Sequence, residues 1–187
     1  MKKQEYVIGI DLGGTKVEAC LMDRERKVYD RCRRFVEADK GLDRVIENIH
    51  AAVNEARKGK RYVAVGMGTP GTYLEENDTI YGAPHTPLYE SKGFIGAVKH
   101  SFDVPVAVEN DANCLALAEY VASCEGKYSH VMSVIMGTGF GSGLVIHDKS
   151  VFPVLSNSLM HLPFLISNLK IYLYSCFIDQ TSKYLPF

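Results

Sequence analysis

The chain has 187 residues, 47% of them hydrophobic, and its 21 basic and 22 acidic residues leave a formal net charge of −1. This length suits one domain with part of a second, and the balanced charge predicts no nucleic-acid partner. The five cysteines are scattered, without a Cys-x-x-Cys or Cys/His cluster, so they imply neither a zinc site nor a disulfide framework. We therefore expect a reducing, cytoplasmic compartment, and the N-terminus shows no signal peptide.

A strand, a glycine turn and a second strand open the chain. Residues 6–10 are apolar and β-branched, and residues 17–22 begin the next strand. Gly13 and Gly14 between them leave backbone N–H groups bare, which favours phosphate, and Asp11 at the strand end can hold a hydrated Mg²⁺. An ordinary hairpin with an Asp-Gly type turn explains the same pattern.

A third strand and a helix follow. Residues 27–36 are plausible as a strand, and their three arginines indicate an edge or a solvated face. Residues 41–57 carry apolar side chains at helical spacing, with Gly59 shortly after the end. The two elements extend an α/β pattern.

The next strand, residues 62–67, ends in the turn Gly68-Thr69-Pro70-Gly71. Open α/β sheets bind ligands at the carboxyl ends of their strands, although a plain turn is the simpler interpretation. We expect residues 73–87 to be an irregular loop, and a loop this long is usually functional or mobile.

Polar residues gather where another strand ends. A helix over 94–102 and a strand over 104–108 lead to Glu109-Asn110-Asp111-Ala112-Asn113, and a helix over 114–121 follows. Asn110 or Asp111 suits a helix N-cap, but a cap does not explain the whole cluster. An ionised carboxylate here is able to accept a proton from a substrate hydroxyl, as in kinases.

A second glycine-rich hairpin completes the interpretable part. The strand over 130–136 ends in the glycine-rich run 137–143, and the chain continues as a strand over 144–147. Two such hairpins in one chain are able to clamp a polyphosphate from two sides.

These motifs together resemble the N-terminal half of a ROK-family sugar kinase over residues 5–147. The resemblance implies an α/β, actin-like (ribonuclease H-like) ATPase fold, with ATP and sugar bound between two lobes. The first lobe is complete over residues 1–125, and residues 126–148 form only the first hairpin of the second lobe. The family also implies a homodimer.

The resemblance also implies roles for individual residues. Asp111 is the base that deprotonates the sugar, and Asp11 organises the Mg²⁺ that accompanies ATP. The expected sugar-binding residues are Gly68, Thr69, Pro70, Gly71, His85, Glu109, Asn110 and Asp111. The expected ATP-binding residues are Asp11, Gly13, Gly14, Thr15, Lys16, Gly137, Thr138 and Gly139.

The implied reaction is ATP-dependent phosphorylation of a hexose or N-acetylhexosamine, with a glucokinase-like transfer to the 6-hydroxyl as the best guess. The alternative is a catalytically inactive, truncated fragment that binds nucleotide or sugar. We set aside the repressor branch of the family, because only ten residues precede Asp11 and a helix-turn-helix has no room there.

Three departures from the family pattern bear on this choice. His85 stands where the family usually supplies an asparagine to the sugar, so it either binds a sugar hydroxyl or is only a loop residue. Family members are longer, and they continue into a Glu-x-Gly-His segment and a cysteine-rich zinc motif that this chain lacks. The missing residues favour the inactive fragment.

The tail over 149–187 does not match the family. It is apolar, but a lysine in the middle of a membrane helix costs roughly 2.5–3.5 kcal/mol, so Lys170 argues against a membrane span. Its pattern fits neither a clean helix nor alternating strands, which predicts poor order. The change in composition is consistent with a shifted reading frame, an alternative transcript or a genuine replacement of the second lobe.

Overall fold

The structure is a computed structural model that describes residues 4–83, 85–124, 128–136, 140–146, 149–151 and 169–175. The chain forms two compact units, residues 1–110 (unit 1) and 111–187 (unit 2). The sequence placed the end of the first lobe at residue 125. The division falls earlier because helix α3 (Asp111–Glu119) packs within unit 2, where Ala116 contacts Val131 and Val145.

Unit 1 is built on a five-stranded sheet with the order β3-β2-β1-β4-β7. The first three strands form an antiparallel meander, whereas β4 runs parallel to β1, and β7 runs parallel to β4. The carboxyl ends of β1, β4 and β7 therefore meet at one edge of the sheet. The strands are β1 (Tyr6–Leu12), β2 (Lys16–Asp23), β3 (Val28–Phe35), β4 (Val65–Thr69) and β7 (Val106–Asn110).

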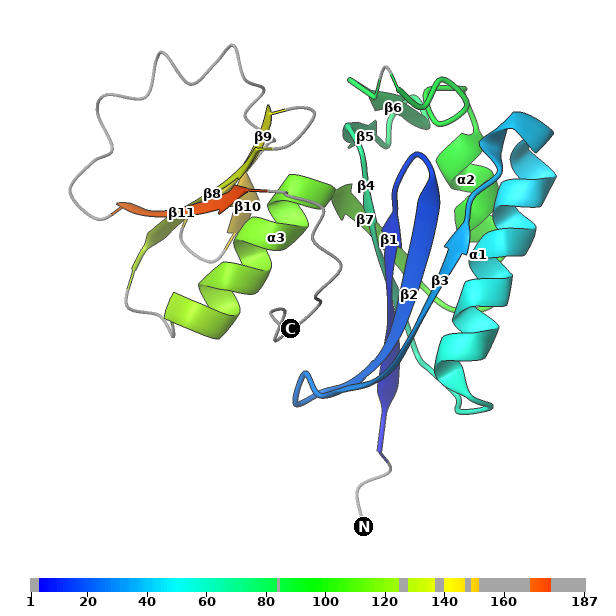
Figure 1. Ribbon diagram of the computed structural model, residues 1–187, viewed down its shortest axis with the longest axis horizontal. Coiled ribbons are helices and arrows are strands. Elements are labelled where there is room, and N and C mark those ends of the chain that lie inside the picture. The colour runs from blue at the N-terminus through cyan, green and yellow to red at the C-terminus, as the bar shows by residue number, and fades with distance from the viewer. Residues whose placement is uncertain are drawn as a thin grey trace. The chain divides into compact units, whose positions relative to one another are not determined.

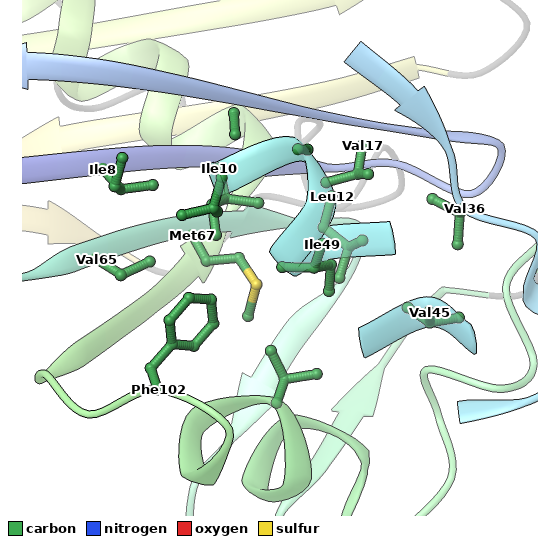
Figure 2. Packing of buried hydrophobic residues seen from close by; sticks show 14 of the residues in the cluster. Ile8, Ile10, Leu12, Val17, Val36, Val45, Ile49, Val65, Met67 and Phe102 are labelled. Carbon is green, nitrogen blue, oxygen red and sulfur yellow. The ribbon is translucent and has the colours of Figure 1, made fainter. Parts of the chain in front are cut away.

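Helices α1 (Leu42–Arg57) and α2 (Phe94–His100) cover one face of this sheet (Figure 1). Alternating side chains of the strands point to that face and are buried, as the period of a strand requires. The buried side chains of α1 recur every three or four residues, which confirms the predicted helix. Figure 2 shows how the strands and α1 share one core, labelled at Ile8, Ile10, Leu12, Val17, Val36, Val45, Ile49, Val65, Met67 and Phe102.

The stretch expected to be an irregular loop contains a short hairpin. Strands β5 (Thr72–Leu74) and β6 (Thr79–Tyr81) pair antiparallel. Each has three residues, too few to show an alternating pattern. Asp78 after the turn has a positive φ of 49°, and its carboxylate accepts a hydrogen bond from the Gly96 amide at 2.9 Å, which ties the hairpin to α2.

Unit 2 places α3 and the π-helical turn η2 (Tyr120–Cys124) before a four-stranded sheet of order β10-β9-β8-β11. The first turn of α3 lies directly against the hairpin that β8 forms with β9, since the Ser133 hydroxyl of β8 donates to the Ala112 carbonyl at 3.1 Å. The strands are β8 (His130–Met136), β9 (Phe140–Ile146), β10 (Lys149–Val151) and β11 (Leu169–Ser175).

Two strands come from the tail, which was expected to form no regular element. β10 pairs antiparallel with β9, and β11 pairs parallel with β8 from Leu169 opposite His130 to Ser175 opposite Met136. Backbone groups make these ladders, so they do not require an alternating side-chain pattern. None of the helices in the described ranges has the length and apolar run that a membrane span needs.

Candidate functional site

Three predicted polar or glycine positions lie side by side at the carboxyl edge of the unit 1 sheet. Asp11 of β1 is opposite Gly68 of β4, and Gly68 is opposite Glu109 of β7. Neighbouring strands lie about 4.8 Å apart, so the backbones of Asp11 and Glu109 are roughly 10 Å apart across one glycine. Gly68 is buried and places no side chain between the two carboxylates.

The predicted turn after β4 is bound to the end of β7. The buried Asn110 donates from its side-chain nitrogen to the Gly71 carbonyl at 2.9 Å, and its amide donates to the Glu109 carboxylate at 2.8 Å. Gly71 has a φ of 75°, and a Cβ there would lie 2.6 Å from the Tyr81 carbonyl oxygen, so only glycine fits. The structure thus brings together Gly71, Glu109 and Asn110, which the sequence placed in one sugar site.

Thr69, the last residue of β4, is fully buried, and its hydroxyl oxygen has no hydrogen-bond partner among the described residues. Such a group is uncommon in folded proteins and marks a place where a water or ligand atom supplies the missing partner. This observation is independent of the motif that first singled out Thr69.

Asp111 directly follows Asn110 in the chain and is the first residue of α3, in unit 2. The sequence predicted this helix from Cys114, and it begins three residues earlier. The Asp111 carboxylate accepts a hydrogen bond from the Ala112 amide at 2.7 Å. A carboxylate in the first turn of a helix is stabilised by the partial positive charge there.

The glycine turn between β1 and β2 is held from two sides by backbone hydrogen bonds. The Gly13 amide donates to the Lys16 carbonyl at 3.0 Å, and the Val36 amide donates to the Thr15 carbonyl at 2.9 Å. Within the described part of the chain, the amides of Gly14 and Thr15 donate no hydrogen bond, and both residues are exposed. Two bare, adjacent N–H groups are the kind of backbone arrangement that binds anions, and phosphate binding at this turn stays a prediction.

Lys16 follows the turn and extends its ammonium group over the ring of Phe35, 5.7 Å from the ring centre. The side chain is exposed and makes no ion pair with another described residue. Its charge is therefore available near the turn for a phosphate.

The loop that carries His85 lies against this turn. His85 is exposed, and its carbonyl oxygen is 3.9 Å from the position that a Cβ at Gly14 would occupy. Pro70 follows β4 and is partly exposed. The second predicted phosphate turn, Gly137, Thr138 and Gly139, lies outside the described residues, as does Pro84.

Two residues that the sequence did not single out contact the glycine turn. The hydroxyl of the buried Tyr89 donates to the Gly13 carbonyl at 2.8 Å. The Thr86 methyl group lies 2.7 Å from where a Cβ at Gly14 would stand. No local pattern marks either residue, because both contacts join segments far apart in the chain.

A groove of about 760 Å³ lies beside the turn, toward β3, and is lined in part by Gly14, Thr15, Arg33 and Arg34. The two arginines are paired with Glu18 and Glu55, and acidic side chains also line the groove. Because these charges are balanced, the bare amides are the stronger anion-binding feature here.

No group of three or more His, Cys, Asp or Glu side chains suited to a metal ion occurs in the described ranges. Mg²⁺ needs no such group, since it usually keeps several waters and binds one or two carboxylates together with substrate phosphates. Asp11 is exposed at the end of β1, one residue before the turn, so a hydrated Mg²⁺ fits beside it.

The antiparallel meander, the parallel strands added beside β1 and the two glycine hairpins define an actin-like ATPase fold. Solved structures share it. A ROK-family glucokinase from Streptomyces griseus, in complex with glucose and AMPPNP, aligns with a TM-score of 0.68 at 29% identity, over 81% of this chain and 48% of that one. A ROK hexokinase from Thermus thermophilus aligns with a TM-score of 0.67 at 29% identity, over 78% of this chain and 48% of that one.

Residues 7–152 match the ROK family model, and the chain belongs to the ROK family. A glucokinase from Streptomyces coelicolor is 34% identical over 147 residues, and an N-acetyl-D-glucosamine kinase from Citrobacter koseri is 33% identical over 144 residues. Each alignment covers 76% of this chain, but only 44% and 47% of those relatives. The chain therefore spans about half the length of the curated relatives it matches.

Proposed function

We propose that this chain is part of an ATP-dependent sugar kinase, which transfers the γ-phosphoryl group of ATP to a hydroxyl of a hexose or N-acetylhexosamine. The observation that carries the proposal is the alignment of Asp11, Gly68 and Glu109 at the carboxyl ends of adjacent parallel strands. This is where open α/β sheets bind their ligands. Relatives named for glucose and N-acetylglucosamine support this substrate class.

In this proposal the sugar lies over the turn after β4. Asn110 is fixed by its bond to the Gly71 carbonyl, and Glu109 is fixed by the Asn110 amide, so neither side chain must be ordered when sugar binds. Groups ordered in advance lower the entropy that binding costs. Thr69, Pro70 and His85 complete the proposed sugar-binding set.

Asp111 is the proposed base. Its carboxylate takes the proton of the sugar hydroxyl as the hydroxyl oxygen bonds to the γ-phosphorus, and the bond from that phosphorus to the bridging oxygen of ADP breaks. The proton moves to Asp111, and ADP leaves with the bridging oxygen. A glucokinase-like enzyme would use the 6-hydroxyl in this step.

The phosphates of ATP are proposed to lie on the amides of Gly14 and Thr15, with Lys16 close by. These donors face solvent already and require no rearrangement to meet an anion. When bound beside Asp11, Mg²⁺ supplies neutralisation of phosphate charge. Gly13, together with Gly137, Thr138 and Gly139, completes the proposed ATP-binding set.

A coupled assay with MgATP and a panel of sugars tests the proposal on the intact chain. The kinase proposal requires turnover with at least one hexose or N-acetylhexosamine, and it requires Asp111→Asn to lower kcat by roughly 10²–10⁴ with sugar binding near normal. Asp103→Asn is the control, because Asp103 is an exposed carboxylate after α2. An Asp111→Asn variant with unchanged kcat would remove Asp111 from the role of base.

A second candidate is a chain that binds nucleotide and sugar without turnover. It is favoured by the coverage of only 44–47% of the curated relatives, because two-lobed kinases complete their site by closing a second lobe. Calorimetry separates the two candidates. Binding of both ligands without phosphoryl transfer would identify the binding fragment, and measurable transfer would identify the kinase.

A further inference from the structure

The loop that carries His85 is held by hydrogen bonds among Ala83, Thr86, Tyr89 and Glu90. The Thr86 amide and hydroxyl both donate to the Ala83 carbonyl, at 2.8 and 3.1 Å. The Tyr89 amide donates to the Thr86 carbonyl at 2.9 Å, and the Ala83 amide donates to the Glu90 carboxylate at 2.8 Å. These bonds tie Thr86, the residue after His85, to Ala83 and so restrict the backbone of the loop.

Tyr89 links this loop to the core and to the glycine turn at once. Its ring is fully buried and stacks on Phe94, with the ring centres 4.6 Å apart and the planes 21° apart. Its hydroxyl donates to the Gly13 carbonyl at 2.8 Å. Burial raises the pKa of the Tyr89 hydroxyl far above its usual range, so the group remains a donor at physiological pH.

The bond to the Gly13 carbonyl fixes the direction of the next amide. A trans peptide is planar, and its C=O and N–H groups point in opposite directions. When Tyr89 holds the Gly13 oxygen, the Gly14 N–H is turned away from the buried tyrosine. That amide donates no hydrogen bond within the described part of the chain.

Thr86 packs on the glycine turn from the side of the His85 loop. A Cβ at Gly14 would lie 2.7 Å from the Thr86 methyl group, so the loop packs directly on the backbone of the turn. The turn is thus braced by Tyr89 and Thr86 from the loop, and by the Val36 amide from the other side.

We propose that Tyr89 is a positioning residue, which aims the Gly14 amide at nucleotide phosphate and couples the turn to the His85 loop. The inference rests on the proposed function, because it assigns phosphate to the turn and sugar to the loop. Occupancy of the sugar loop then restricts the turn, and nucleotide binds more tightly when sugar is present. Tyr89 itself touches neither ligand.

Tyr89→Phe tests the proposal, because phenylalanine keeps the ring on Phe94 and removes only the hydroxyl. Without this bond the Gly13–Gly14 peptide is less ordered in the unliganded chain, and ordering it again on binding should weaken nucleotide binding by roughly 5- to 30-fold. Calorimetry with MgAMP-PNP, with and without saturating glucose or N-acetylglucosamine, should show that loss and a smaller effect of sugar on nucleotide affinity. Binding of sugar alone should change less than about twofold, because the variant leaves the sugar-binding side chains intact.

Tyr73→Phe is the matched control. The Tyr73 hydroxyl donates to the Asp78 carboxylate at 3.1 Å, and burial raises its pKa to about 12, but it does not contact the turn. This variant should keep the affinity of the wild-type chain for MgAMP-PNP.

A readout without ligand separates this inference from the proposed function. Amide exchange of Gly13 and Val36, which donate the two bonds that brace the turn, should become faster in Tyr89→Phe and stay unchanged in Tyr73→Phe. Equal exchange in both variants would overturn the role of Tyr89. If the turn loosens but the wild-type chain binds no nucleotide, the proposed function and the ligand coupling fail, and only the brace remains.

Discussion

The two sheets of this protein share one strand order but differ in what supports them. In unit 1 the order begins β3-β2-β1-β4, and in unit 2 it is β10-β9-β8-β11, each an antiparallel meander followed by a strand parallel to its first member. In unit 1, α1 and α2 bury one face of the sheet in a single continuous core. The described part of unit 2 has two small clusters instead, one of them around Ala116 of α3.

This comparison of the two sheets indicates that strand order and folding stability have separate physical origins in this protein. A glycine-bearing hairpin and a parallel neighbour suffice to specify the order, because both depend on backbone pairing. The free energy of folding comes mainly from apolar area removed from water, and among the described residues most of the buried apolar side chains belong to unit 1. We therefore expect unit 1 to resist unfolding better than unit 2.

The largest effect should come from the core of unit 1. Ile49→Ala removes a fully buried side chain from the face of α1 that packs on the sheet, and such substitutions cost about 2–5 kcal/mol of unfolding free energy. Urea unfolding followed by circular dichroism measures the loss. The matched pair Val53→Ala in the core of unit 1 and Val131→Ala in the smaller cluster of unit 2 removes the same atoms, and Val131→Ala should cost less. Equal losses in this pair would show that the two cores are equivalent.

The second effect concerns the contact between α3 and β9. A Cβ at Gly143 would overlap the carbonyl group of Ala112, lying 2.5 Å from its carbon, and backbone on both sides resists the shift. Gly143→Ala should cost about 1–3 kcal/mol and speed amide exchange in α3. Gly141→Ala is the control in the same strand, because its Cβ would stand 4.0 Å from the Ala112 Cβ. Similar exchange in both variants would contradict the packing of α3 on this hairpin.

The smallest effect is a pH dependence confined to unit 1. Burial lowers the pKa of His50, which lies 2.9 Å from the Ser101 hydroxyl and packs on Phe102, although the nearby Asp103 opposes the shift. The folded state therefore favours neutral His50. Its contribution is fully present above the unfolded pKa of about 6.5 and is lost as pH falls through the lowered folded pKa.

Urea titrations between pH 7.5 and 5 should show that loss, and His50→Gln should flatten it. An unchanged slope in the variant would assign the pH dependence to other groups. Because His50 joins α1 to the segment after α2, the loss should speed exchange in unit 1 and leave α3 unaffected.

Much of unit 1 could be predicted from the sequence, because its signals are local. The apolar spacing of 41–57 matches α1 (Leu42–Arg57), and the glycine turn falls between β1 and β2 as expected. The hairpin at 72–81 was missed, since strands of three residues carry no period. β11 was missed because its partner is the backbone of β8, almost forty residues earlier in the chain.

The candidate site divides in the same way. The sequence placed Asp11, Gly68 and Glu109 at strand ends, and the family resemblance assigned them to neighbouring ATP and sugar sites before their register was known. It could not find Tyr89, whose partner Gly13 is 76 residues away. A buried hydroxyl bonded to a distant carbonyl leaves no pattern in the sequence around it.

The central claim is that the carboxyl edge of the unit 1 sheet binds sugar and nucleotide, and amide exchange on the intact chain tests it most directly. Glucose or N-acetylglucosamine should slow exchange at residues 68–71 and 109–110, and MgAMP-PNP should slow it at residues 13–16. Protection confined to other segments, or no protection at saturating ligand, would contradict the claim.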